Sequence, residues 1–394
     1  MSRKKSFGTF TLLFVAVFFA AFLAFFIQGK SFVWKSDGFR QYYPALHYLG
    51  SYYRTIISNV LNGNLSLPMI DYTIGQGEDI ITTFANYGLG DPLTLLCTFV
   101  PGDADYEFLY GILVFLRLYL SGITFLVYCE GMKLPRKYSA YGALVYVFCG
   151  FALWSVKDPF FLNAMIYLPL VLLGVEYIQK KRSPLLLAFS VFFSIMSGYY
   201  FFYMTVICAV CYFIARCAMR YEKNGKQLVV DGIRCLFAAL GGVLLSGALF
   251  LPCVYGFMKS SRTEAYVSFR DLLVYDLDYY KNMILHFITV TENDDAGAVG
   301  YFSMAAIILI ALVLLMGKKE RKYRVLKICV AVSFLAVASP FVGYVMNGFG
   351  YITNRFMFIP AFLLSLVFVI VMPDLVALET GRKRGMICVC AIYI

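Results

Sequence analysis

Long apolar stretches alternate with shorter polar segments along the chain, and one long polar and aromatic segment follows the first apolar stretch. Residues 7–27 contain no charged side chain. As a helix this stretch is roughly 31 Å long, which matches the hydrocarbon core of a bilayer. It exceeds a signal-peptide core, and no cleavage pattern follows it. The pattern therefore predicts a retained membrane-spanning helix and a long loop, 28–105, where we expect the working residues.

Nine further apolar stretches bring the prediction to about ten complete spans in one transmembrane domain over 1–394, an all-α polytopic membrane helical bundle. An eleventh stretch opens near 386, so we expect the C-terminal part of the protein to be missing from this chain. The nine stretches are 106–128, 138–156, 160–178, 185–197, 200–216, 232–253, 301–316, 326–343 and 356–372.

The segment 185–216 admits two interpretations. A single helix of this length is roughly 48 Å long, which is too long for one upright span. Basic clusters at both of its ends favour two short helices that turn at Ser197-Gly198. A single kinked helix would invert every later span and place the basic cluster 318–324 on the opposite side of the membrane.

Charges in the loops predict the orientation. Lys and Arg gather before the first span and in alternate connections near 133–137, 180–182, 220–226, 318–324 and 382–384, whereas most acids lie in the other connections. Short cytoplasmic loops collect positive charge. We therefore expect a multi-pass protein of the cell membrane with a cytoplasmic N-terminus and two large extracellular loops, 28–105 and 254–300. The net charge of +11 then reflects orientation, so nucleic acid is not an expected partner.

Composition supports this class and removes several functions. Hydrophobic residues make up 61% of the chain, charged residues 14%, and the mean hydropathy is +0.75. The chain has no GxxxxGK[ST] loop and no HExxH motif, and it has two histidines, so Walker-type ATPases and His-rich metal sites lack support. Most of the eleven cysteines lie in apolar stretches, where a small core residue is the better interpretation.

The candidate chemistry lies directly after the first span. Asp37 is placed to act as a general base toward a hydroxyl acceptor. The planar fork of Arg40 suits a phosphate or a carboxylate. The alternative interpretation is that Asp37 caps a helix at the membrane surface and Arg40 pairs with it or reaches toward the headgroups. Both interpretations stay open on position and composition alone.

Three short motifs follow one another along the chain: Asp37-x-x-Arg40-Gln41-Tyr42-x-Pro44, Asn86-Tyr87-x-x-x-Asp91-Pro92 and Pro159-x-Phe161-Leu162-Asn163. They resemble the bacterial YfhO family of integral membrane proteins, which is similar to the GT-C class of glycosyltransferases. The resemblance implies a catalytic carboxylate on the first external loop, which is Asp37 here. It also implies substrate contacts from Arg40, Gln41, Tyr42, Asp91 and Asp158, and a donor-phosphate contact from Arg355. Lys157-Asp158 stands where a less charged or histidine-containing pair is expected.

The resemblance implies transfer of a sugar from a polyprenyl-phosphate donor to an envelope polymer such as a teichoic acid on the extracellular face. Physical chemistry agrees, because a fixed cation near the bilayer surface stabilises a lipid-phosphate leaving group. Arg355 begins a span, where it either binds that phosphate or anchors its helix. Arg117 lies within a span, so it must face a partner or a water-filled cavity.

Metal use and a transport function are the remaining alternatives. Glu78, Asp79 and Asp91 have the oxygen ligands that a divalent cation prefers, but no tight Asp-x-Asp pair is present, so the cofactor stays open and a metal is not favoured. A polytopic transporter or a flippase for lipid-linked sugars would also use many helices and an intramembrane Arg. A repeat of two halves is not evident, and the long loop favours the transferase.

Overall fold

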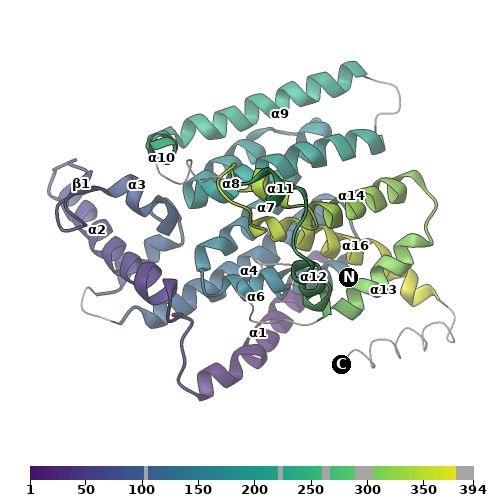
Figure 1. Cartoon of the computed structure of the whole chain (residues 1–394), viewed down its shortest axis with the longest axis horizontal. Helices are drawn as coiled ribbons and strands as arrows, with labels where there is room; N and C mark the ends of the chain where they lie inside the picture. The colour runs from purple at the N-terminus through teal and green to yellow at the C-terminus, as the bar shows by residue number, and fades with distance from the viewer. Residues whose placement is uncertain (102–104, 221–224, 260–266, 289–304, 379–394) are drawn as a thin grey trace.

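The computed structural model describes residues 1–101, 105–220, 225–259, 267–288 and 305–378 (Figure 1). In this part of the chain, one short antiparallel hairpin, β1 (Ile70–Asp71) and β2 (Glu78–Asp79), is the sole strand pair, with Ile70 opposite Asp79. The α-helices are α1 (Arg3–Ile27), α2 (Tyr43–Leu61), α3 (Ile80–Phe84), α4 (Glu107–Gly131), α5 (Arg136–Val147), α6 (Gly150–Ser155), α7 (Asn163–Gln179), α8 (Leu185–Arg220), α9 (Gly225–Leu245), α10 (Gly247–Lys259), α11 (Phe269–Leu273), α12 (Leu277–Ile288), α13 (Ala305–Met316), α14 (Arg321–Val337), α15 (Pro340–Met346) and α16 (Phe358–Ala377).

The polytopic helical class is confirmed. Within the described residues, six helices are long and apolar enough to cross a bilayer, or seven if α14 and α15, which are bent by 91°, form one span. The count of ten stays a prediction. The expected span 138–156 is two short helices, α5 and α6, and the expected span 301–316 holds the 12-residue α13. The eleventh stretch lies outside the described residues.

The segment α8 turns back on itself, as its length and flanking charges predict. Gly198 leaves helical geometry, with φ 161° and ψ 89°. Ser197, just before the turn, accepts a hydrogen bond from Asn163 at the start of α7. Leu187 packs on Gly174, and Cys217 contacts Gln179, so both ends of α8 lie beside the last turns of α7. One straight helix cannot do this, because α7 is itself only roughly 25 Å long.

One face of α1 anchors it to the bundle while its other faces stay outside. The buried side chains are Ser6 and four phenylalanines, each four residues after the last, which places them on a single helix face. Gly122 of α4 permits the close approach, because a Cβ at that position would lie 2.1 Å from the ring of Phe10. The remaining apolar faces of α1 are exposed, as expected of a helix that contacts lipid. The four phenylalanines are Phe10, Phe14, Phe18 and Phe22.

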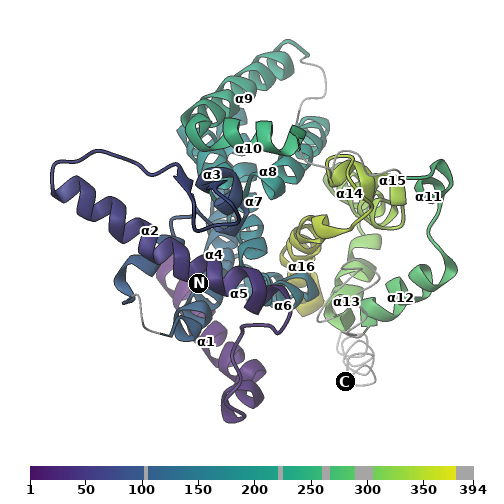
Figure 2. The same cartoon turned by 60° about the vertical axis from the view of Figure 1, so that its left-hand side comes forward.

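The first loop is a folded unit and not an extended connection. Its main helix, α2, is amphipathic, and it buries Leu49 and Tyr53 against α3. The Tyr48 hydroxyl donates a hydrogen bond of 2.7 Å to Asp71, which ties the hairpin to α2. Figures 1 and 2 show α2, α3 and the hairpin projecting together from one side of the bundle. The candidate residues 37–42 lie in the chain between α1 and this unit.

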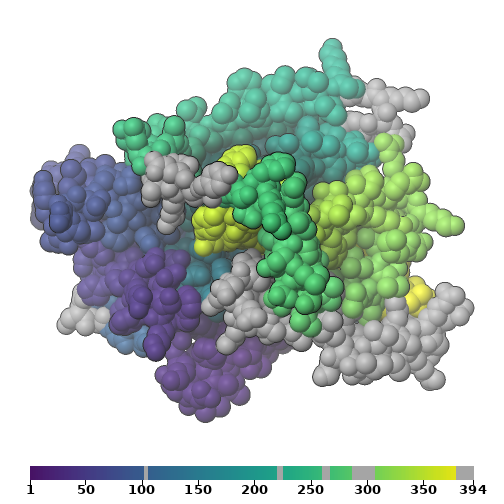
Figure 3. Space-filling view, viewed as in Figure 1, coloured from purple at the N-terminus to yellow at the C-terminus, as the bar shows by residue number. Residues whose placement is uncertain are grey.

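Charged residues at one end of the bundle are joined to carboxylates. Glu176, near the end of α7, is fully buried and receives Arg216 of α8 and Lys180, whose Nζ lies 3.3 Å from Glu176 Oε2. Lys181 lies 2.7 Å from the buried Asp231 of α9. Basic residues in the connections near 180–182 and 220–226 predict that both lie on one side of the membrane. In the structure, Lys180, Lys181 and Arg216 meet at the same end of the bundle. Figure 3 shows that the yellow segment before α16 reaches the surface beside the green α11–α12 segment.

Candidate functional site

A π-helix positions the first candidate residues. Residues Gly38–Tyr42 form one wide turn, in which the Tyr43 amide donates to the Gly38 carbonyl. The Gln41 side-chain amide donates a 3.0 Å hydrogen bond to Asp37 Oδ1. The Tyr87 hydroxyl, from the end of the first loop, donates to Gln41 Oε1 at 2.7 Å. π-Helical turns are rare and often occur at functional sites, so this segment stays a candidate.

Asp158 meets this turn from the connection between α6 and α7. Its side chain lies near Tyr42, and the two residues are 6% and 8% exposed. Asp158 Oδ1 is buried and has no hydrogen-bond partner among the described residues. The pKa of the Asp158 carboxyl is raised to about 6, chiefly by burial, with Lys157 lowering it and the nearby Asp37 adding to the rise. Arg355 and Tyr42 also lower it, so all of these groups lie within electrostatic reach of one carboxyl.

Arg355 lies in a cage of aromatic rings. Its guanidinium carbon is 5.3 Å from the ring centre of Phe161 and 5.8 Å from those of Tyr200 and Tyr351. Asn347 holds the two tyrosines, because it accepts from the Tyr200 hydroxyl and donates to the Tyr351 carbonyl at 2.7 Å. Within the described residues, Arg355 forms no ion pair. Cation–π contacts place its charge without neutralising it, which leaves it suited to an anionic ligand.

Lys157 is placed by the two tryptophans of the chain. Its Nζ lies 4.3 Å from the ring centre of Trp34 and 4.7 Å from that of Trp154. The Trp154 ring in turn packs on Phe161, at 5.9 Å between centres, so the surroundings of Lys157 and Arg355 adjoin. Neither tryptophan is among the residues predicted for the site from sequence. Their rarity, two in 394 residues, was the available signal.

Asp91 lies in a different environment from the other candidates. Its Oδ2 forms a 2.5 Å ion pair with Arg117 Nη2, and both side chains are fully buried. Asn163 joins the pair, since it donates to Asp91 at 3.0 Å and accepts from Arg117 Nε at 3.0 Å. The Arg117 guanidinium lies on the Phe160 ring, 4.8 Å from its centre. The intramembrane Arg117 therefore has a protein partner, and a substrate contact by Asp91 stays a prediction.

Arg40 also stands apart. Its side chain is exposed, and within the described residues it makes no hydrogen bond or ion pair. The Asp37 carboxylate is instead bonded by Gln41, so the pairing of Arg40 with Asp37 is not observed. The structure thus gathers five of the seven predicted residues around Asp158. These are Asp37, Gln41, Tyr42, Asp158 and Arg355.

The carboxylates considered for a metal are dispersed. Asp79 caps α3 by accepting from the Thr82 amide at 2.7 Å, and Asp91 is paired with Arg117. In the described ranges, no group of three or more His, Cys, Asp or Glu side chains is arranged to hold a metal ion. Neither residue lies in the cluster around Asp158.

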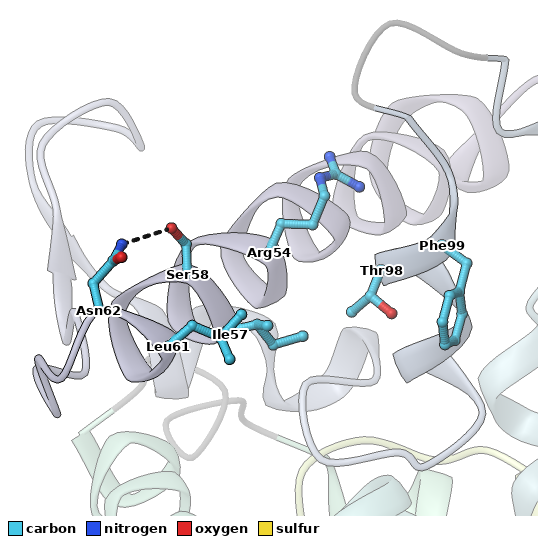
Figure 4. Close-up of a pocket in the computed structure, with 7 residues that line it drawn as sticks. All are labelled: Arg54, Ile57, Ser58, Leu61, Asn62, Thr98 and Phe99. Atoms are coloured by element: carbon cyan, nitrogen blue, oxygen red, sulfur yellow. Dashed lines mark hydrogen bonds between the residues drawn. The ribbon is translucent and has the colours of Figure 1, made fainter.

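A hollow of about 370 Å³ lies elsewhere, between α2 and the 3₁₀ segment Thr94–Phe99 (Figure 4). Arg54 borders it, but its guanidinium donates to the backbone carbonyls of Cys97 and Val100 at 3.2 and 2.5 Å. The Arg54 guanidinium is thus already hydrogen-bonded to the backbone of the loop, and the other side chains that line the hollow are mostly apolar or carry a hydroxyl group. The lining residues are Arg54, Ile57, Ser58, Leu61, Asn62, Thr98 and Phe99.

Comparison with known proteins identifies the family. A family described as "Bacterial membrane protein YfhO" matches residues 9–394. The chain is 25% identical over 225 residues to "Uncharacterized protein YfhO" of Bacillus subtilis (strain 168), and this match covers 57% of the chain and 24% of that protein. No solved structure matches the chain. Because the family match extends over nearly the whole sequence, the chain belongs to the YfhO family of bacterial membrane proteins.

Proposed function

We propose that this protein is a membrane glycosyltransferase of the GT-C type, which moves a sugar from a polyprenyl-phosphate donor to an envelope acceptor such as a teichoic acid on the extracellular face. The observation that carries the proposal is the convergence of Asp37, Asp158 and Arg355 at one end of the bundle. Such a transfer needs a carboxylate base and a cation for the leaving group, and Arg355 is a guanidinium that forms no ion pair with any residue that the structure describes.

The roles follow from the chemistry of each group. Asp37 takes the proton of the acceptor hydroxyl, whose oxygen then bonds to the sugar carbon. The bond from that carbon to the phosphate oxygen breaks, and the electron pair stays on the lipid phosphate. Arg355 offsets this developing charge with the parallel N–H groups of its fork.

The fixed geometry supports this assignment. Gln41 is bonded to both Asp37 and Tyr87, so the carboxylate has a defined orientation before a ligand binds. Arg355 precedes α16, and its segment Arg355–Met357 continues directly into that apolar helix, which is the position expected of a cation that meets a lipid headgroup. Preorganised charge of this kind needs little rearrangement during reaction.

Reconstitution tests the proposal directly. The full-length protein is placed in vesicles that contain lipid extract, and defined polyprenyl-phosphate sugars are added one at a time. The proposal predicts release of free polyprenyl phosphate for one sugar and not for others, with the sugar recovered on an acceptor. Movement of intact donor across the bilayer without release of lipid phosphate would contradict it and favour a flippase.

A further inference from the structure

The Asp158 carboxyl is buried, and its hydrogen bonding is incomplete. One of its oxygens, Oδ1, is buried without a hydrogen-bond partner among the described residues, and the side chain as a whole is 6% exposed. Leaving a charged oxygen in that position is costly, whereas protonation removes much of the cost. The site is therefore built so that the protonation state of Asp158 responds to its neighbours.

Those neighbours come from four parts of the fold. Tyr42 and Asp37 face Asp158 from the π-helical turn, and Lys157 lies on its own connection. The other two groups are Tyr110 of α4, whose hydroxyl donates to the Lys157 carbonyl at 2.9 Å, and Arg355 before α16. Arg355 lies within electrostatic reach of Asp158, yet the two form no ion pair in the described structure. Aromatic rings hold the guanidinium instead.

We propose that an anionic phosphodiester binds at the aromatic cage of Arg355 and that Asp158 takes up one proton from solvent as it binds. The inference rests on the proposed donor site and adds its regulation by pH. No other bond changes: the proton moves from water to the Asp158 carboxylate, and the ligand keeps its single negative charge. The uptake removes a like charge next to the incoming phosphate, which is why binding and protonation favour each other.

The direction of the pH effect follows from the existing environment. Burial already raises the pKa of Asp158 to about 6. A bound anion disfavours the charged carboxylate and raises this pKa further. Ligand affinity is therefore highest below pH 6, where Asp158 is protonated in both states, and it falls as the pH rises. A rise of one unit on binding makes the affinity about tenfold higher at pH 5 than at pH 8.

Calorimetry of the full-length protein in detergent tests the linkage. The probe is methyl farnesyl phosphate, a phosphodiester whose charge does not change between pH 5 and 8. Titrations in buffers of different ionisation enthalpy count the protons taken up. We expect uptake near pH 7 and about tenfold weaker binding at pH 8 than at pH 5. Asp158→Asn should bind the probe with no pH dependence and no proton uptake.

Two further variants keep the test decisive. Tyr42 lowers the pKa of Asp158, so Tyr42→Phe should move the pH dependence to higher pH. His47→Gln is the matched control, because it removes the imidazole of α2 and leaves Asp158 and its neighbours in place, and it should leave the linkage unchanged. No binding at any pH, wild-type binding without proton uptake, or linkage that persists in Asp158→Asn would each overturn the inference. Sugar release in the vesicle assay is measured separately, so a failure here leaves the proposed transfer testable by itself.

Discussion

At one end of the bundle, Arg216 and Lys180 lie against the buried carboxylate of Glu176, whereas at the other end Arg355 lies among the rings of Phe161, Tyr200 and Tyr351. The first arrangement satisfies its charges within the protein. The second fixes the position of a charge and leaves its counterion open. A cation that is paired contributes to the fold, and a cation that is only caged is available to a ligand.

The helix α7 connects the two arrangements. Glu176 lies near its C-terminal end, and the segment Pro159–Leu162, which carries Phe161, leads into its N-terminal end. Between them, Arg117 and Asp91 form a fully buried pair bridged by Asn163. Charges that are paired within the protein thus lie at the C-terminal end of α7 and beside its first residue, and the caged Arg355 lies near the segment that leads into the N-terminal end.

The largest expected effect is on sugar transfer, and it comes from a substitution at the end of the bundle that holds Arg355. Asp37→Asn keeps the shape of the side chain but removes the proposed base, so transfer in the vesicle assay should fall about 10²- to 10⁴-fold. Asp71→Asn is the matched control, since Asp71 is a carboxylate of the same loop that bonds Tyr48 and Thr73 and lies outside the proposed site. Unchanged turnover in Asp37→Asn, at equal amounts of folded protein, would remove Asp37 from the mechanism.

A substitution of Glu176, at the end of the bundle where the charges are paired, should lower the stability of the protein and leave ligand binding unchanged. Glu176→Gln leaves Arg216 and Lys180 without their shared carboxylate, and breaking a pair of this kind costs about 3 kcal/mol. Thermal unfolding in detergent measures the loss, and calorimetry with methyl farnesyl phosphate measures binding. A folded Glu176→Gln protein that loses affinity for the phosphodiester would break the distinction between the two ends.

Asp158 gives a smaller effect with a defined pH window. Its folded pKa of about 6 lies above its ordinary value of 3.8, so its contribution to stability is full below about pH 4 and is lost as the pH rises through 6. Asp158→Asn should therefore raise the unfolding temperature at pH 8, by an amount that corresponds to roughly 2–3 kcal/mol, and give little gain near pH 3.5, below the ordinary pKa of the carboxyl. Equal gains at both pH values would show that charge burial is not the cause.

The sequence predicted the parts of this arrangement that depend on local pattern. Asp37, Gln41 and Tyr42 follow one span within a few residues, and the turn at Gly198 follows from helix length and flanking charge. The prediction also required a partner or a water-filled cavity for Arg117, because an intramembrane charge is costly. It did not identify Asp91 as that partner, since the two residues lie 26 positions apart and only the folded chain brings them together.

The aromatic cage could not be derived from pattern for the same reason. Phe161 lies in the 3₁₀ helix before α7, Tyr200 in α8 just after Gly198, and Tyr351 in the segment before α16. Each residue alone is typical of the aromatic belt at a bilayer surface. The hydrogen bonds of Asn347 to both tyrosines define the cage, and they depend on how the turn of α8 meets the segment before α16. Tertiary packing decides these contacts.

The measurement that tests the central claim most directly is the affinity of methyl farnesyl phosphate for Arg355→Lys at pH 5, with Arg216→Lys as the control at the paired end. Lysine keeps the charge but supplies a point charge in place of two parallel N–H groups, so the account predicts about tenfold weaker binding in Arg355→Lys and unchanged binding in Arg216→Lys. Indistinguishable affinities for the wild type and Arg355→Lys would contradict the account, and would show that Arg355 is an interfacial anchor and that the phosphate is held elsewhere.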